Sequence, residues 1–581
     1  MDVFLTGLRA YFLTISAFLL TFWLPIVASA QPLQDIGQSI QKQQLDIKKE
    51  QETLQREKLQ RELDNDFKQL APRIKEPAIK SADGQCFVIE TILFAGLSGL
   101  PKRALSDVTE IAQAFVGRCL HLAEMSDIVS QINQYFLDHG LVTTRAFLPE
   151  QSLKKGELLI RVIVGKVKAI ESNTLTTRNL TWAFPVESDQ LLSLRDIEQG
   201  LDQINRLGSN QSTIKLIPGD LPGQSVVQVN NIKNDRFYAR LGVDGTSIQQ
   251  GDDYRARADF FADDLIGIND QLIVNYNQSL AETTRSLSKG LGFDYSFPWH
   301  YSLFSISGNR FEYENIVNGS NQNFEVSGDN TVFSLAANHT LYRNRSIKLD
   351  VASSLTTKDI NNFIEDTRID VSSRRLSVFR VETKHKQYLW KDMTVFLNLS
   401  IDAGLDILGA DDDGQSIYPD KAQFVKYGFL TSAYKPLYSD LLGVWGLGAS
   451  AQYQHTGDIL PSSEKLLVAS SSQLTGYGPL NLTGNTGGWL RFDANSPYFY
   501  RSDTTGAVLS SRISLMKGWV PHNSLQPFNY GNATATELAF IAQGYGFSLE
   551  LMIGKTIASS SSLIAEPDNP EFGLKLAYNT L

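Results

Sequence analysis

The chain has 581 residues, of which 42% are hydrophobic, and a formal net charge of -10. Its length allows several domains, and its acidic balance argues against a nucleic-acid surface. A slightly negative mean hydropathy excludes a bundle of membrane helices. It does not exclude a β-barrel, whose strands alternate lipid-facing and polar residues.

Residues 1–30 are predicted to be a signal peptide. Arg9 precedes a long apolar run that ends in Ala28-Ser29-Ala30, and this small-x-small pattern is typical of a cleavage site. An uncleaved membrane anchor is the alternative, because the run approaches the length that spans a bilayer. In either case the chain leaves the cytoplasm.

Residues 31–83 are predicted to form an N-terminal helix and a linker. The first forty of them are polar and helix-prone, and Pro72 and Pro77 end the pattern. A helix that is polar on all sides bridges solvent or lies in a wet cavity. A partly disordered linker is the alternative.

Residues 84–168 are predicted to form a small α/β unit in the order strand, helix, strand, strand. Its helix places Ile128, Ile132 and Phe136 on one stripe, and Gly140 ends it. Its last strand lies in "GELLIRVIVGKVKAI", residues 156–170.

The chain has two cysteines, Cys86 and Cys119, both in this unit. A lone pair in one small exported domain favours a disulfide. A metal site would need further Cys or His residues nearby, and His121 alone does not make a cluster.

Residues 169–232 repeat the same plan and so indicate an internal repeat. The helix places Leu194, Ile197, Leu201 and Ile204 on one face. A hairpin follows, turning through Pro218-Gly219 and Pro222-Gly223.

Residues 233–581 lose helical periodicity and alternate between apolar and polar residues. Phe293, Phe297 and Trp299, for example, alternate with Asp294 and Ser296. A face rich in aromatic residues opposite a polar face is typical of a transmembrane barrel, and the length suits about 16 strands. A soluble sandwich is the alternative, but the run is long for one.

No catalytic or cofactor motif stands out. The seven histidines are scattered. "IGKT" at 553–556 lacks the first glycine of a phosphate loop, and Asp411, Asp412 and Asp413 match a calcium loop poorly. We therefore expect no enzyme, no metal site and no cofactor.

The whole chain resembles the two-partner secretion transporters of the hemolysin-activator type. "CFVIETILFAG" and "GLVTTRAFLPEQSLKKGEL" resemble their first POTRA domain. "SLRDIEQGLDQINRL" and "IPGDLPGQSVVQV" resemble the second. "QLTGYGPLNLTGNTGGWLRFD" resembles their sixth extracellular loop and the following strand, and "LQPFNYGNA" a later strand.

The resemblance implies a 16-stranded outer-membrane barrel, two periplasmic POTRA domains, a pore-plugging N-terminal helix and a paired Cys86 and Cys119. The partner would be an unfolded exoprotein with an N-terminal secretion domain (a hemolysin, adhesin or contact-dependent toxin) exported without ATP. The resemblance also implies a monomer in outer-membrane lipid with no nucleic-acid partner. A gated porin, a barrel assembly factor and a soluble adhesin are the rival functions.

One motif departs from the family. The family's loop tip reads Val-Arg-Gly-Tyr, whereas here it is Leu474-Thr475-Gly476-Tyr477. The family's aspartate on the partner strand, in a motif that includes Phe528, is Asn532 here. Both ends of the family's ion pair are thus neutral. Losing only one would leave a buried charge unpaired. We expect Thr475 and Asn532 to face each other and hold the loop more loosely. A degenerate, inactive copy is the alternative.

Overall fold

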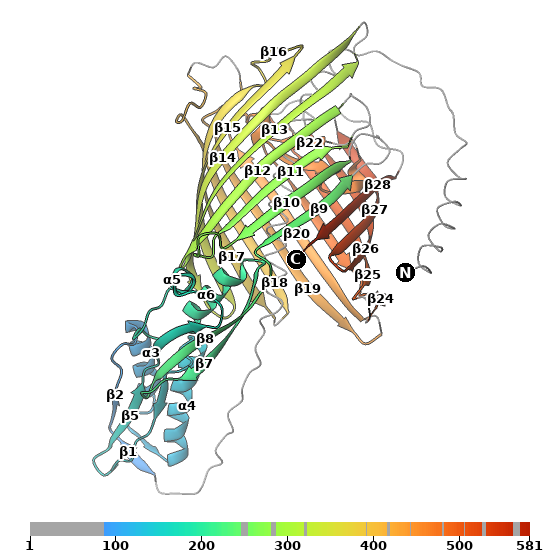
Figure 1. The fold of residues 1–581 in the computed structure, drawn as a ribbon. Coiled ribbons are helices and arrows are strands. Elements are labelled where there is room, and N and C mark those ends of the chain that lie inside the picture. The colour runs from blue at the N-terminus through green and yellow to red at the C-terminus, as the bar shows by residue number, and fades with distance from the viewer. Residues whose placement is uncertain are drawn as a thin grey trace.

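The computed structural model describes residues 86–580 apart from 246–253, 281–285, 319–321, 391, 415–418, 442, 479–480, 503, 505, 526–529 and 562–569. The expected signal peptide (1–30) and the N-terminal helix with its linker (31–83) lie outside the described residues. Two α/β units form an arm that joins one rim of a large barrel (Figure 1).

The first α/β unit packs two helices on a three-stranded sheet of order β2-β5-β4, beside a two-stranded sheet of β1 and β3. The helical stripe expected from the sequence is its core, because Ile128, Ile132 and Phe136 are fully buried. Its elements are β1 (Phe87–Ile89), β2 (Thr91–Ala95), α3 (Lys102–Gln113), β3 (Arg118–Leu120), α4 (Leu122–Asp138), β4 (Arg145–Phe147) and β5 (Glu157–Ile163).

The second unit has the corresponding sheet order, β6-β8-β7. Its first strand begins at Lys166, inside the segment that the sequence analysis gave to the first unit. The long apolar run is divided at Val164-Gly165, where an added Cβ on Gly165 would overlap the Thr143 side chain. The elements are β6 (Lys166–Ser172), α5 (Thr177–Ala183), α6 (Leu194–Asn205), β7 (Asn210–Pro218) and β8 (Gln224–Lys233).

Sixteen long antiparallel strands in the described chain close a barrel, as the sequence predicts, and β28 pairs with β9. Two short strands, β16 (Thr367–Arg368) and β24 (Tyr500–Arg501), extend hairpin ends. The long strands are β9 (Phe237–Gly245), β10 (Arg255–Asp263), β11 (Gln271–Ser279), β12 (Ser286–Trp299), β13 (Ser302–Asn318), β14 (Asn323–Arg343), β15 (Ile347–Ile364), β17 (Arg374–Leu389), β18 (Met393–Leu405), β19 (Val425–Ser439), β20 (Gly443–Thr456), β23 (Gly487–Asn495), β25 (Val508–Val520), β26 (Gly531–Gly544), β27 (Phe547–Ser561) and β28 (Glu571–Asn579).

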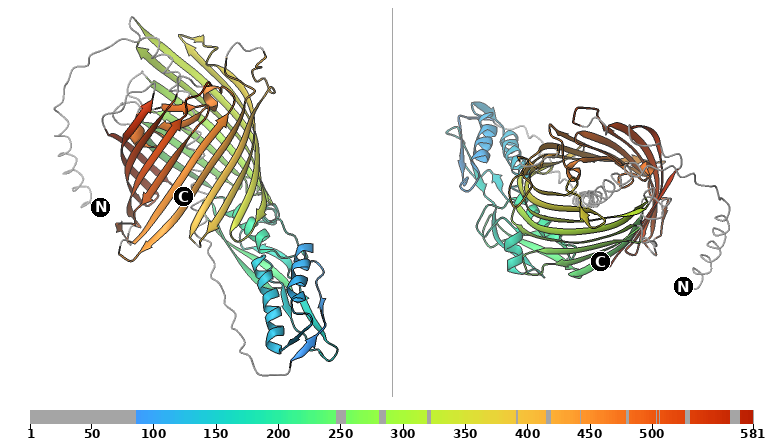
Figure 2. Two further views of the ribbon diagram at one scale, coloured as in Figure 1. Left: turned by 180° about the vertical axis from the view of Figure 1, so that it is seen from behind. Right: turned by 90° about the horizontal axis from the view of Figure 1, so that it is seen from above.

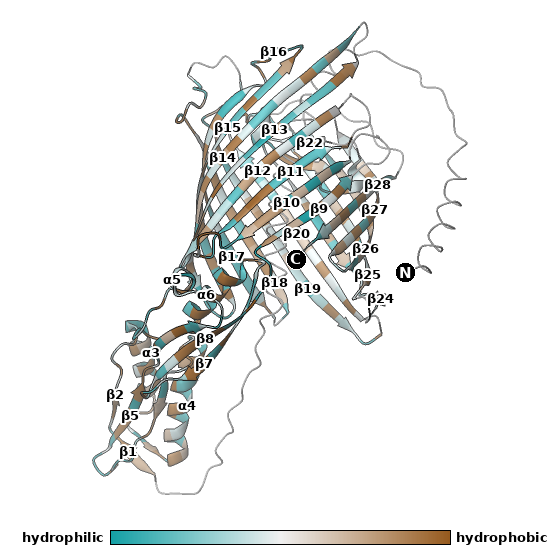
Figure 3. Ribbon diagram, viewed as in Figure 1, coloured by the Kyte–Doolittle hydropathy of each residue, from teal (hydrophilic) through white to brown (hydrophobic). Residues whose placement is uncertain are grey.

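Apolar and polar residues alternate along these strands (Figure 3). On β12, Leu291 and Phe293 are exposed, whereas Gly292 and Ser296 are buried. Side chains of a strand alternate between its two faces, so the exposed apolar face is the one that meets lipid. Among the described residues, no helix has both the length and the apolar character to cross a membrane.

Candidate functional site: a loop folded into the barrel

The sixth loop on the rim opposite the α/β units, residues 457–486, turns back into the barrel instead of extending away from it. Within it, β21 (Leu466–Ser470) pairs with β22 (Asn481–Gly484), and every residue of β21 is buried. A short helical turn, η3 (Thr475–Tyr477), forms the tip between them. The turn η3 contacts β26, β27 and β28 of the barrel wall. The loop therefore occupies the lumen side of the wall.

Three polar contacts of 3.0 Å or less hold the tip to the wall. The Tyr477 side chain is fully buried, and its hydroxyl lies 3.0 Å from the Met516 carbonyl oxygen. The Thr475 N–H donates to the Glu537 carboxylate at 2.7 Å. The Thr556 hydroxyl donates to the Gly476 carbonyl at 2.8 Å. Two of the three contacts use loop backbone, so they do not depend on a charged loop side chain.

Small residues let the loop approach this closely. A Cβ on Gly476 would lie 2.5 Å from the Thr536 carbonyl oxygen and 2.6 Å from the Lys555 nitrogen, closer than real Cβ contacts. Two glycines of the wall lie equally close to the loop. A Cβ on Gly554 would overlap the Gly476 backbone, and a Cβ on Gly518 would overlap Val468. Contact at backbone distance therefore requires glycine on both sides.

The wall supplies the charges next to the tip. Arg512 on β25 contacts Glu537 at 3.3 Å and also pairs with Glu550. Arg491 on β23 contacts Asp493 at 2.9 Å, and its guanidinium donates to the Gln473 carbonyl of the loop at 2.6 Å. Both arginines thus belong to the barrel, and Arg491 meets the loop at a backbone carbonyl.

The base of the loop is held by a second cluster of charges. The buried Glu464 carboxylate contacts Lys358 at 2.6 Å and Lys426 at 2.8 Å. Asp402 lies 3.6 Å from Lys426 and 2.6 Å from Arg380. The loop is therefore fixed at its base by ion pairs and at its tip by hydrogen bonds.

Thr475 and Asn532 have different partners in the structure. The Thr475 hydroxyl lies 3.6 Å from the Met552 sulfur, whereas the Asn532 amide donates to the Ser560 hydroxyl at 2.7 Å in an exposed position. On β26 the buried lumen-facing residues Ala533, Ala535 and Glu537 are odd-numbered. Strand alternation therefore turns Asn532 to the other face. The expected pairing is corrected to Thr475 with Glu537, and Phe528 lies outside the described residues.

Glu537, Arg512 and Arg491 were not predicted from the sequence. Each is a charged residue that alternates with lipid-facing apolar residues, such as Leu490 and Phe492 on either side of Arg491. That pattern marks a lumen-facing charge. It does not reveal which charge the loop will meet.

The second α/β unit is attached to the rim by side chains of α6 and by Arg206, the residue that directly follows this helix. Arg343 at the end of β14 contacts Asp202 at 2.6 Å and Glu198 at 3.5 Å. Arg206 donates to the Asn269 carbonyl at 2.6 Å. Burial lowers the pKa of the Arg206 guanidinium to about 10, with nearby carboxylates opposing the shift, so it stays charged at neutral pH.

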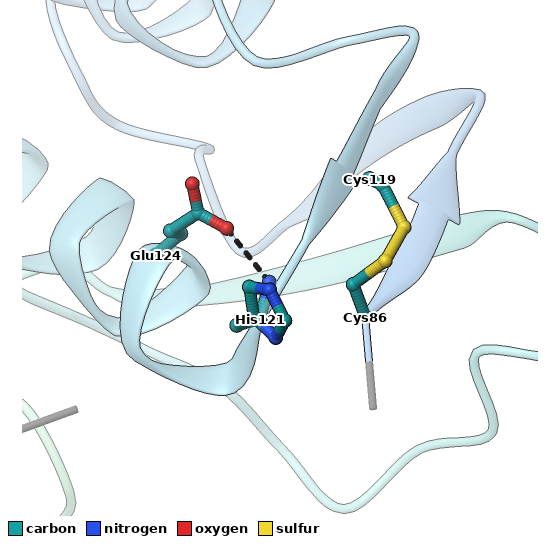
Figure 4. The surroundings of a disulfide bond; sticks show 4 residues. All are labelled: Cys86, Cys119, His121 and Glu124. Carbon is teal, nitrogen blue, oxygen red and sulfur yellow. Dashed lines mark hydrogen bonds between the residues drawn. A yellow bond between two sulfur atoms is a disulfide. The ribbon is translucent and has the colours of Figure 1, made fainter. Parts of the chain in front are cut away.

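Cys86, the residue before β1, is joined to Cys119 of β3 by a disulfide (Figure 4). Strand β1 lies at the end of the arm away from the barrel (Figure 1). Beside the disulfide, the Glu124 carboxylate accepts a hydrogen bond from the His121 N–H at 2.8 Å, capping α4. His121 therefore takes part in a helix cap. The described residues contain no group of three or more His, Cys, Asp or Glu that could hold a metal ion.

Comparison with known families decides the affiliation. The family model described as haemolysin secretion/activation protein ShlB/FhaC/HecB matches residues 223–524, more than half of the 581 residues. The chain belongs to this family. A ShlB-type POTRA domain matches residues 87–165, and a further POTRA domain matches residues 166–218. The two α/β units are thus POTRA domains, and the assignment made from the sequence is confirmed.

Named relatives agree with this affiliation, and a solved structure has the same fold. The chain is 28% identical over 447 residues to outer membrane transporter CdiB of Dickeya dadantii, covering 76% of this chain and 78% of that protein. It is 24% identical over 510 residues to hemolysin transporter protein HpmB of Proteus mirabilis, covering 86% and 88%. The structure of CdiB from Escherichia coli has the same fold, with a TM-score of 0.83 at 24% identity over 95% of this chain and 100% of that one.

Within the haemolysin secretion/activation family, this chain holds its sixth loop differently from the expected motif. The arginine expected at the loop tip is Thr475, and the wall arginine Arg512 already occupies the Glu537 carboxylate. The other carboxylate oxygen of Glu537 accepts a hydrogen bond from the backbone N–H of Thr475 at the tip. The neutral tip is therefore a consistent arrangement and leaves no buried charge unpaired.

Proposed function

We propose that this chain is an outer-membrane transporter that receives an unfolded partner exoprotein in the periplasm through its POTRA domains and secretes it through the barrel. The observation that carries the proposal is the pairing of two POTRA domains with a closed barrel whose lumen holds a docked loop. Relatives named as transporters of hemolysin support it. The chain acts as a monomer and not as an enzyme.

Transport needs no ATP in this proposal. An extended cargo adds to a sheet edge through backbone hydrogen bonds, which tolerate any sequence. Cargo that folds outside the cell cannot slide back, so folding biases the direction of movement.

The structure favours β7 of the second POTRA domain as the receiving edge. The Asn205 side chain bonds both the N–H and the C=O of Ser212, at 2.7 and 3.0 Å. The backbone N–H and C=O of Ser212 therefore point away from β8. In an antiparallel pair every second residue points its backbone groups to the same side, so the N–H and C=O of Ile214 and Leu216 also point away from β8. Within the described chain, no hydrogen bond to these two residues is found on that side.

The corresponding edge of the first POTRA domain is closed. Its strand β4 has three residues, and the Asn133 amide bonds both backbone groups of the central Ala146, at 2.8 and 3.0 Å. Covering an exposed edge in this way prevents another strand from pairing there. Of the two equivalent edges, β7 is thus the one that accepts a cargo strand.

Deletion of the gene tests the proposal. If a neighbouring gene encodes a long exoprotein, that protein should accumulate in the periplasm and reappear outside the cell when the chain is supplied in trans. A porin predicts unchanged export and a high steady conductance of the purified chain. An assembly factor predicts instead that other barrel proteins are lost from the outer membrane.

A further inference from the structure

Helix α5 of the second POTRA domain lies against the outer surface of the barrel. The Trp182 ring lies 4.8 Å from the Trp299 ring, nearly perpendicular to it, and 6.3 Å from Phe297. Both partners belong to the odd-numbered face of β12, which also carries the exposed Leu291 and Phe293. Trp182 therefore extends the face of the strand that meets lipid.

The turn between β10 and β11 continues this surface. The Asn179 amide of α5 donates to the Asp264 carboxylate at 2.7 Å, and the Asn269 amide donates to the Asn179 carbonyl at 2.8 Å. This turn exposes Leu265 and Ile266, which are 40% and 52% accessible. Two aliphatic side chains thus lie exposed next to α5. A turn that faces water usually carries Gly, Pro, Asn, Asp or Ser instead.

A basic residue accompanies the apolar ones. Arg178 is exposed and lies four residues before Trp182, on the same side of α5. Indole rings prefer the boundary between hydrocarbon and water, and guanidinium groups bind phosphate by paired hydrogen bonds. In the view from above, Figure 2 shows the POTRA arm to one side of the barrel. The outer face of the barrel wall is the face that meets lipid.

We propose that α5 and the β10–β11 turn form a phospholipid-binding surface in the headgroup layer of the periplasmic leaflet. Leu265, Ile266 and Trp182 enter the hydrocarbon boundary, and Arg178 meets the lipid phosphate. Its continuity with the lipid-facing side of β12 indicates lipid as the occupant. The second POTRA domain is then held by the membrane as well as by the barrel.

Photocrosslinking in lipid vesicles tests this surface without any cargo. Benzoylphenylalanine is placed at Ile266 in the full-length protein, in phosphatidylethanolamine and phosphatidylglycerol vesicles that carry an alkyne-tagged phospholipid. Leu335 on the lipid-facing side of β14 is the positive control, and Leu93 in the first POTRA domain is the negative control. Their exposures are similar, at 46% and 45%. Heat-modifiable mobility verifies that each variant is folded.

We expect tagged lipid to attach at Ile266 in a yield within about twofold of that at Leu335. A yield at Ile266 as low as at Leu93 would overturn the proposal. So would a protein adduct at Ile266 in cells without a lipid adduct, because that would make a partner protein the occupant. Neither readout depends on export, so failure here would leave the transporter function untouched.

Discussion

At the scale of single residues, Glu537 connects the loop to the wall. Its carboxylate accepts the Thr475 N–H and pairs with Arg512. Removing one partner of a buried ion pair costs about 3–5 kcal/mol, whereas a glutamine amide at position 537 keeps an oxygen that can accept the Thr475 N–H. The side chain at position 537 is thus expected to control whether the tip stays docked.

We predict that Glu537→Ala releases the loop tip, whereas Glu537→Gln largely retains it. The measurements are single-channel conductance in planar bilayers and protease cleavage within residues 466–484 of the folded barrel. Glu537→Ala should raise both. Equal conductance for Glu537→Ala and the unchanged protein would show that another contact holds the tip.

The corrected partner of Thr475 gives a second prediction. Asn532 lies five residues from Glu537 on β26, about 16 Å along a strand, and on the opposite face. Thr475→Arg and Asn532→Asp should therefore act independently, so that the double variant changes unfolding free energy by the sum of the singles within about 0.5 kcal/mol. Denaturant unfolding in detergent measures this. A coupling above about 1 kcal/mol would mean that the two side chains meet.

At the scale of secondary-structure elements, the open edge of β7 can be blocked without breaking the β7–β8 ladder. Leu216 packs against the core of the domain, so its replacement loses some packing but no ladder hydrogen bond. We predict that Leu216→Pro removes an outward N–H while leaving the β7–β8 ladder in place, because proline is tolerated on the free side of an edge strand. Export of the exoprotein should fall while the POTRA domain stays folded. Secretion assays and circular dichroism measure the two effects.

Lys215→Pro is the matched control for this edge. Its N–H points toward β8, so proline there breaks the ladder and should destabilise the domain itself. Unchanged secretion by a folded Leu216→Pro protein would exclude β7 as the receiving edge.

The elements differ in how far the sequence predicts them. Strand alternation and the helical stripe of α4 are local patterns, and so the barrel and the core of the first POTRA domain were predicted correctly. Residues 156–170 form one continuous apolar run in the sequence. Only long-range strand pairing assigns Glu157–Ile163 to the sheet of the first POTRA domain and Lys166–Ser172 to the sheet of the second. The docking of Thr475 on Glu537 depends on the register between β20, β23, β25 and β26. A local sequence pattern does not predict that register.

At the scale of the whole molecule, the junction between α6 and the barrel sets the direction of the POTRA arm. Arg343 contacts both Asp202 and Glu198 across it. We predict that Arg343→Ala leaves these two carboxylates without their shared cation and broadens the range of arm orientations.

Spin labels at Leu221 and Tyr438, both exposed residues, allow this to be measured by double electron–electron resonance. Arg343→Ala should widen the distance distribution. Arg310→Ala is the control, because it removes an exposed pair with Glu312 on the barrel alone and should change nothing. Equal distributions for all three proteins would place the control of orientation elsewhere.

The seam that closes the barrel adds a kinetic consequence to the position of the loop tip. The Ala239 N–H donates to the Thr580 hydroxyl, joining residues 341 positions apart. Such distant contacts are the slowest to form, because the chain between them must first be ordered. The tip contacts β26 through Glu537 and β27 through Thr556, and a Cβ on Gly573 of β28 would lie 2.9 Å from the Thr475 hydroxyl. A tip that docks on the last three strands before they pair with β9 would lower the entropy lost at closure, and the loop would then serve assembly of the barrel as well as its later use.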